Sequence, residues 1–122
     1  GFGGGSFGGG MGGGRSGGYL VFQSGYSMTY YDKLTCNSTA YYSGGENGAA
    51  WTTATGHAVG LGIVAADPKT FAYHSRMFIQ SYGMGQVEDT GGMKGNVIDV
   101  WFPSYSDCVS WGRRNVTVWL LD

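Results

Sequence analysis

Two aspartates lie on either side of a glycine-rich turn in the second half of the chain. Asp89 ends the run "GQVED", and Asp99 stands in the middle of the apolar run "VIDVWF". A carboxyl group between Ile98 and Val100 is partly desolvated, and desolvation and a nearby like charge both raise its pKa. A carboxyl that stays protonated near neutral pH can act as a general acid and donate a proton to a leaving group. The pattern predicts acid/base chemistry, with Asp99 as the acid and Asp89 as its partner.

The turn between the two aspartates reads "TGGMKG". Glycines allow backbone N–H groups and a substrate to approach closely, so we expect Thr90 and Gly91 to contact the substrate. Lys94 supplies a positive charge that would stabilise negative charge near the reacting oxygen. An aspartate before glycines is also a common turn residue, so a structural role for Asp89 stays open.

Other polar residues are candidates for binding rather than for chemistry. Asp67 precedes Pro68 and can hold a loop by accepting hydrogen bonds from backbone N–H groups. His57 and His74 do not have the spacing of a metal-binding set, and no third ligand is evident, so we predict neither a metal nor another cofactor. Three hydroxyl groups could contact substrate or could belong to ordinary strand residues, namely those of Thr39, Tyr41 and Thr55.

Short strands must position these residues. The chain contains β-branched or aromatic runs bounded by Gly, Pro, Asn or Ser, which are typical of strands. The predicted strands are Leu34–Tyr42, Gly62–Ala66, Arg76–Gln80, Gly85–Asp89, Val97–Phe102 and Asn115–Leu121. In the last of them Val116, Val118 and Leu120 share one face. Only "SYSDCVSWG" predicts a helix, because Ser104 or Ser106 can cap its start and Gly112 can end it.

Charge and composition narrow the classes of partner. The formal net charge is -1 and only 12% of residues are charged, so the chain has no basic stripe of the kind that binds nucleic acid. Aromatic residues make up 16% of the chain, which suits binding of a neutral surface such as a sugar. No apolar run approaches the roughly 20 residues of a membrane span, and no charged-then-apolar leader is present. We expect no membrane span in this chain.

The chain divides into a glycine-rich segment and one domain. Of the first 18 residues 12 are glycine. The segment therefore has too few apolar side chains to offset the conformational entropy that ordering it would cost. We expect 1–18 to be a flexible tail or linker, 19–33 to be an additional hairpin or a connector, and 34–122 to be the folded domain. A domain of this size buries a single core.

The two cysteines, Cys36 and Cys108, lack the close spacing of a zinc or redox motif. If joined, they would close a loop of about 70 residues and constrain the unfolded chain by about 4 kcal/mol in the entropic model. A disulfide would also imply an exported protein. The alternative is two free thiols that act as small buried hydrophobic groups. The sequence leaves both alternatives open.

Several segments occur in an order that resembles a known family. Between about Thr39 and Leu121 the chain reads "TAYYSGG", "TATG", "GIVAADP", "EDTGG", "KGNVIDVWF" and "WGRRNVTVWLLD". This order resembles the 3D domain, named for three aspartates, of bacterial cell-wall proteins of the stationary-phase survival type, and is similar to the catalytic barrel of membrane-bound lytic transglycosylase A. The chain departs from the family after "ADP", where it reads "FAYHS" instead of a form such as "IPLGT" and so brings in His74.

The resemblance implies a fold, an activity and a location. The fold is all-β, a six-stranded double-psi β-barrel with one short helix. The activity is a lytic transglycosylase that cleaves peptidoglycan glycan strands to 1,6-anhydro products, in an extracytoplasmic location. By the same match the three aspartates are Asp67, Asp89 and Asp99. Two alternatives remain, a barrel that binds wall polysaccharide without cleaving it, as expansin-like relatives of this architecture do, and a glycan hydrolase.

Overall fold

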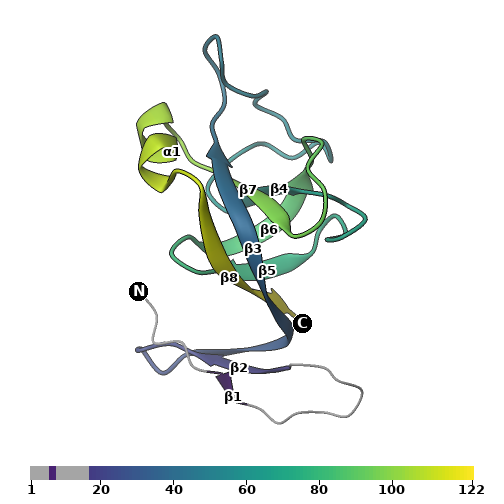
Figure 1. Ribbon diagram of the computed structural model, residues 1–122, viewed down its shortest axis with the longest axis vertical. Coiled ribbons are helices and arrows are strands. Elements are labelled where there is room, and N and C mark those ends of the chain that lie inside the picture. The colour runs from purple at the N-terminus through teal and green to yellow at the C-terminus, as the bar shows by residue number, and fades with distance from the viewer. Residues whose placement is uncertain (1–5, 8–16) are drawn as a thin grey trace.

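The computed structural model describes residues 6–7 and 17–122, so most of the predicted glycine-rich tail lies outside the described residues. The described part is mostly β-structure with one short helix (Figure 1). Its elements are β1 (Ser6–Phe7), β2 (Gly18–Val21), β3 (Ser27–Tyr41), β4 (Ile63–Ala66), β5 (Arg76–Ile79), β6 (Gly83–Asp89), β7 (Val97–Trp101), α1 (Tyr105–Trp111) and β8 (Arg114–Leu121).

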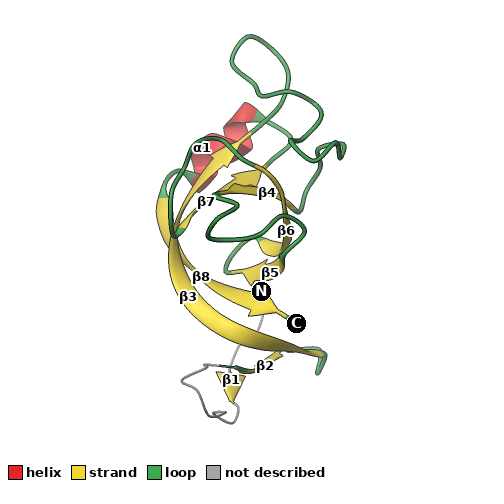
Figure 2. Cartoon of the chain, turned by 90° about the vertical axis from the view of Figure 1, so that its right-hand side faces the viewer, coloured by secondary structure: helices red, strands yellow, loops and turns green. Residues whose placement is uncertain are grey.

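Six of the strands form a closed ring. Neighbouring strands pair in the order β3, β7, β4, β6, β5 and β8, and β8 also pairs with β3. The pairs β3–β7 and β4–β6 are parallel, and the other pairs of the ring are antiparallel. Figure 2 shows the strands curving around a common interior. The mostly β composition expected from the sequence is confirmed.

The interior of the ring is the main hydrophobic core. One face of β8 supplies Val116, Val118 and Leu120, as the alternation of the sequence predicts. Val64 on β4 and Val100 on β7 are cross-strand partners on neighbouring strands, and both are fully buried. Burying an aliphatic side chain of this kind stabilises the fold by about 1.5–3 kcal/mol, so the ring is a well-packed support for the residues at its rim.

A second, smaller core lies under the hairpin formed by β2 and β3. Leu20 and Tyr30 pack there against Phe78, Trp119 and Leu121. The strand β3 therefore begins at Ser27 rather than at Leu34, because Ser27–Tyr30 pairs with β2 and the strand pairs with β8 from Tyr30 onward. The predicted hairpin or connector at 19–33 is thus continuous with the first strand of the ring.

The helix α1 has the limits that the sequence predicts. Ser104 is its N-cap, and its hydroxyl accepts a hydrogen bond of 3.2 Å from the backbone N–H of Asp107. Gly112 ends the helix with a φ of 65°, a conformation that favours glycine. Trp111 anchors the helix in the core, where its indole N–H donates to the Ser38 hydroxyl at 3.1 Å. No helix in the described part of the chain is long and apolar enough to span a membrane.

Both cysteines are free thiols in this structure. Cys36 is buried, and its burial raises the pKa of the thiol to about 11. Cys108 lies on α1 and is partly exposed. Of the two alternatives that the sequence left open, the fold realises the free thiols. Packing and the hydrogen bond from Trp111 to Ser38 attach α1 to β3, with no disulfide between them.

Candidate functional site

Asp89 and Asp99 lie in one row across the sheet. Asp99 on β7 pairs with Thr39 on β3 and with Ala65 on β4, and Ala65 pairs on its other side with Asp89 on β6. Residues directly opposite each other on neighbouring strands project from the same face of a sheet. The two aspartates are two strand spacings apart, about 10 Å between their backbones, and only the small side chain of Ala65 stands between them.

Asp99 has the environment of a general acid. Its neighbours Ile98 and Val100 are fully buried, while Asp99 itself is half-buried on the opposite face. Burial raises the pKa of the Asp99 carboxyl, and the negative charge of Asp89 raises it further. A hydrogen bond of 3.0 Å from the Thr39 hydroxyl to Oδ1 works against this rise but does not cancel it. The direction of the pKa shift expected from the sequence is therefore found.

Asp89 is held by three donors. Its Oδ1 accepts hydrogen bonds from the backbone N–H groups of Ala54 at 3.1 Å and Thr90 at 3.0 Å. Its Oδ2 accepts a hydrogen bond of 3.1 Å from the Tyr41 hydroxyl. Burial raises the pKa of Tyr41 far above its usual range, and the charges of Asp89 and Asp99 raise it further. Tyr41 is thus a permanently protonated donor close to both carboxyls.

Asp67 has a different role, because its carboxylate closes a turn. It accepts hydrogen bonds from the backbone N–H groups of Lys69 at 3.0 Å and Gly95 at 3.3 Å, and from the Thr70 hydroxyl at 3.1 Å. These hydrogen bonds lower the pKa of Asp67, and the charge of Lys94 contributes a smaller lowering. This is the loop-holding arrangement expected for an aspartate before proline, and it places the charge of Lys94 near Asp67.

The remaining predicted binding residues divide between the aspartate row and its surroundings. Thr39 and Tyr41 bond directly to the two candidate catalytic carboxyls. Thr90 and Gly91 are exposed in the turn after β6, where a substrate can reach them. The hydroxyl of Thr55 does not reach the row, because it donates to Glu88 Oε1 at 2.5 Å.

An aromatic groove of about 340 Å³ adjoins the row. Tyr41, which donates a hydrogen bond to Asp89 in the row, also lines the groove. Tyr42 and Tyr105 form the rest of the aromatic lining, with ring centroids 5.7 Å apart. Cys108 lies in the groove, and the charge of Asp99 contributes to the raised pKa of its thiol after the effect of burial. Tyr105 is 65% exposed, so its ring is available to a ligand. Aromatic faces beside polar groups suit the binding of sugar rings.

Glu88 is the residue that the sequence interpretation missed. Its side chain is completely buried from solvent, and its carboxylate contacts the imidazole rings of both His57 and His74. The departure "FAYHS" was a signal, since it introduces His74, but the partner could not be identified without the fold. Within the described residues no group of three or more His, Cys, Asp or Glu side chains is arranged to hold a metal ion.

The comparison with protein families agrees with this arrangement. A family model described as "3D domain" matches residues 62–122, half of the chain, and the match includes all three aspartates of the predicted motif. The chain belongs to the 3D domain family. The strands β4 to β8 and both aspartates of the row lie within the matched residues.

Two relatives from Bacillus subtilis (strain 168) are similar to this chain. The "Cell wall-binding protein YocH" is 37% identical over 95 residues, which cover 74% of this chain and 33% of that protein. The "Putative cell wall shaping protein YabE" is 34% identical over 94 residues, which cover 73% of this chain and 23% of that protein. The chain thus spans a third or less of the length of these relatives.

Proposed function

We propose that this 3D domain is a lytic transglycosylase that cleaves the β-1,4 bond between N-acetylmuramic acid and N-acetylglucosamine in peptidoglycan. The observation that carries the proposal is the half-buried Asp99, with its raised pKa and with Asp89 in the same row of the sheet. A carboxyl whose protonated form is favoured by burial and by a nearby negative charge is suited to give a proton to a leaving glycosidic oxygen.

One carboxyl is sufficient for this reaction. Asp99 protonates the glycosidic oxygen as the bond to the anomeric carbon breaks. The resulting carboxylate then removes the proton from the 6-hydroxyl of the same muramic acid residue, whose oxygen bonds to the anomeric carbon. The product is a 1,6-anhydro sugar, no water is consumed, and Asp99 returns to its protonated form.

Neighbouring groups tune and orient this acid. Asp89 raises the pKa of Asp99 through its charge. The Thr39 hydroxyl fixes Oδ1 of Asp99 with a hydrogen bond of 3.0 Å. Tyr41 orients Asp89 and borders the aromatic groove, so it connects the acid/base pair to the surface where we place the glycan strand. Lys94 is exposed, its charge lowers the pKa of Asp67, and it meets the substrate at the edge of the site.

The closed ring supports a more specific fold assignment. We propose that β3, β7, β4, β6, β5 and β8 form a six-stranded double-psi β-barrel. Two parallel pairs within an otherwise antiparallel ring support this assignment. The relatives named for cell-wall binding and cell-wall shaping support a site of action outside the cytoplasm.

A second candidate function is binding of wall polysaccharide without cleavage. The name of the relative that is 37% identical, a cell wall-binding protein, favours it, and the aromatic groove would serve it equally well. A hydrolase is the third candidate, in which one carboxyl acts as acid and the other as base for water.

Mass spectrometry of purified sacculi after incubation with the protein separates the three. The transglycosylase gives anhydro-muropeptides, and a hydrolase gives new reducing ends instead. An unchanged digest, with the protein sedimenting with the sacculi, would replace the proposal with the binding function.

A further inference from the structure

Glu88 is a fully buried carboxylate that the proposed chemistry does not use. It belongs to β6, directly before Asp89, and none of its side chain is exposed. A buried charge is stable only if it is paired and fully hydrogen-bonded. The groups around Glu88 must therefore explain why the chain keeps it.

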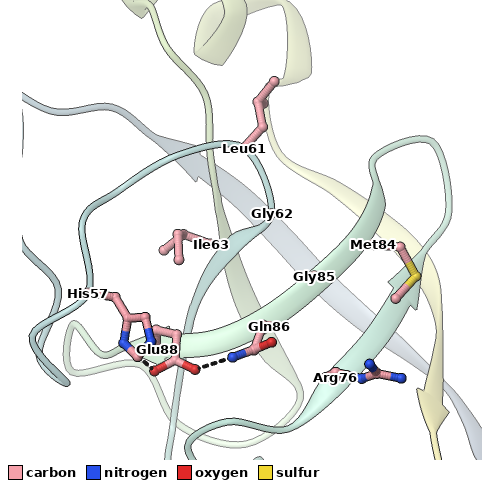
Figure 3. A pocket seen from close by; sticks show the side chains of 9 residues that line it. All are labelled: His57, Leu61, Gly62, Ile63, Arg76, Met84, Gly85, Gln86 and Glu88. Carbon is pink, nitrogen blue, oxygen red and sulfur yellow. Dashed lines mark hydrogen bonds and ion pairs between the residues drawn. The ribbon is translucent and has the colours of Figure 1, made fainter.

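Four donors surround the two carboxylate oxygens. Oε1 contacts the Thr55 hydroxyl at 2.5 Å and Nδ1 of His57 at 3.1 Å. Oε2 contacts the Gln86 amide at 2.6 Å and Nδ1 of His74 at 2.9 Å. Figure 3 shows Glu88 between His57 and Gln86 at one end of a surface pocket of about 430 Å³. The two imidazole rings lie close together, with centroids 6.2 Å apart.

Burial raises the pKa of Glu88, but the hydrogen bonds from Thr55, Gln86 and His74 and the charge of His57 outweigh it and lower the pKa to about 2. Glu88 is therefore ionised throughout the neutral and mildly acidic range. The other charged group beside the pocket is Arg76 on β5.

The backbone of His74 supports a specific role for its ring. Its φ is 76°, in the left-handed region that residues other than glycine seldom adopt. The conformation is held by a hydrogen bond of 2.7 Å from its backbone N–H to the carbonyl of Val87. Residues in such conformations persist where the surroundings determine them strongly, and they concentrate at functional sites. Here the conformation accompanies the contact between the imidazole and Glu88.

Glu88 anchors a turn that also touches the candidate catalytic pair. The turn, residues 53–57, is closed by its own hydrogen bonds, from the N–H of Thr53 to the carbonyl of His57 and from the N–H of Gly56 to the carbonyl of Thr53. Its attachment to β6 runs through the side chains of Thr55 and His57 and through the N–H of Thr55, which donates to the carbonyl of Glu88. Between these anchors, the N–H of Ala54 donates to Asp89 Oδ1.

We propose that Glu88, held by His57 and His74, is a positioning residue that fixes the 53–57 turn so that the Ala54 N–H orients the carboxylate of Asp89. This inference rests on the proposed function where it concerns turnover, and on the hydrogen-bond geometry alone where it concerns the turn. Neighbouring residues of β6 thus divide the work: Asp89 faces Asp99, and Glu88 secures the loop that orients Asp89.

Glu88→Gln tests the role. The amide has a similar shape, but its NH₂ group meets the donors of Gln86 and His74 instead of accepting from them. Glu46→Gln is the matched control, because it makes the same chemical change at an exposed glutamate. Amide hydrogen exchange of Ala54 and Thr55 is measured by NMR alongside core amides such as that of Val100, and turnover of glycan strands is measured on the same samples.

The proposal expects exchange at Ala54 and Thr55 to become about tenfold faster relative to Val100 in Glu88→Gln, with no change in Glu46→Gln. It also expects kcat to fall by about tenfold or more at nearly constant KM, because the substrate still binds while the reacting groups are misplaced. If Glu88→Gln does not fold, His74→Asn provides the test, since its side chain is exposed and asparagine tolerates the left-handed conformation.

Two results would overturn the proposal. One is exchange at Ala54 that is unchanged in these variants, and the other is exchange that accelerates equally at Ala54 and Val100, which would mean that Glu88 serves only global stability. If the unaltered protein cleaves no glycan, the proposed function fails, and the exchange data alone still decide whether Glu88 fixes the turn.

Discussion

Asp99 and Asp89 pair with the same residue, Ala65, from opposite sides of β4. The arrangement places two carboxyls on one face with a methyl group between them. The parallel pair β4–β6 shifts register between Val64 and Ala65, and this irregularity brings Asp89 level with Asp99. A bulge of this kind redirects side chains at the edge of a site.

Asp89→Asn should change the pH dependence of turnover. The charge of Asp89 raises the pKa of Asp99, so its removal lowers that pKa. A general acid is lost as the pH rises through its pKa, so the limb on which activity falls with rising pH should move to lower pH. The measurement is kcat on defined glycan strands across pH. Asp32→Asn, at an exposed aspartate, is the control, and a limb that stays in place or moves to higher pH would exclude this role for Asp89.

Tyr105→Ala should weaken binding of glycan and leave the fold intact. The side chain is 65% exposed and packs edge-on against Tyr42, so its removal costs little stability. Loss of one aromatic contact should raise the Kd for soluble glycan fragments by about three- to tenfold. Tyr26→Ala removes another exposed tyrosine, in the turn between β2 and β3, and should leave the Kd unchanged. Equal affinities for all three proteins would show that the groove is not the glycan surface.

Asp67→Asn should lower stability in a pH-dependent manner. The pKa of Asp67 is lowered in the folded protein by hydrogen bonds to Lys69, Gly95 and Thr70. A lowered pKa contributes stability that is present above the ordinary value of 3.8 and is lost as the pH falls through the folded-state pKa. Thermal melts should therefore show a lower Tm for the variant at pH 7, and the difference should shrink below about pH 4. A difference that is the same at both pH values would contradict this account.

The two free cysteines should differ in their reactivity toward a thiol reagent. A thiol reagent should modify Cys108 in the folded protein, since it is partly exposed, and Cys36 only after unfolding, since it is buried with a pKa of about 11. Two thiols per chain should titrate in denaturant without reductant, and reductant should not alter Tm. Finding no free thiol would mean that the cysteines are paired.

The local structure was largely predictable from the sequence. The caps of α1 at Ser104 and Gly112 depend on neighbouring residues only, and the structure has them as expected. The limits of β4 and β7 fall within one residue of the expected runs, because alternation and breakers define a strand locally. The predicted start of β3, at Leu34, was wrong by seven residues, because the strand begins at Ser27. Its first half is stabilised by pairing with β2 and β8, and no local sequence pattern reveals these partners.

The site was predictable in part. The motif identified Asp99 and Asp89, and alternation gave the face of Asp99. The shared pairing with Ala65 requires the ring to close and a bulge to form, and both are long-range features. Glu88 reads in sequence as one more polar residue at the end of a strand. Its burial depends on His57 and His74, which approach it from separate loops.

Asp99→Asn removes the proton on which the proposed reaction depends. The amide keeps the size of the side chain and its acceptor for Thr39, but it has no proton to give and recover. The pKa of Asp99 is raised in the folded protein above its ordinary value of 3.8. The resulting contribution to stability is fully present at pH values below 3.8 and is lost as the pH rises through the folded-state pKa. At neutral pH the ionised form is therefore a cost, and the variant should melt at the same temperature as the unaltered protein or slightly above it.

The deciding measurement is the rate at which the folded Asp99→Asn variant releases anhydro-muropeptides from purified sacculi. We expect release to fall by a factor on the order of 100 or more, while the variant still sediments with the sacculi. Near-normal release by a folded variant would contradict the assignment of Asp99 as the acid/base and would leave its carboxylate a structural role only.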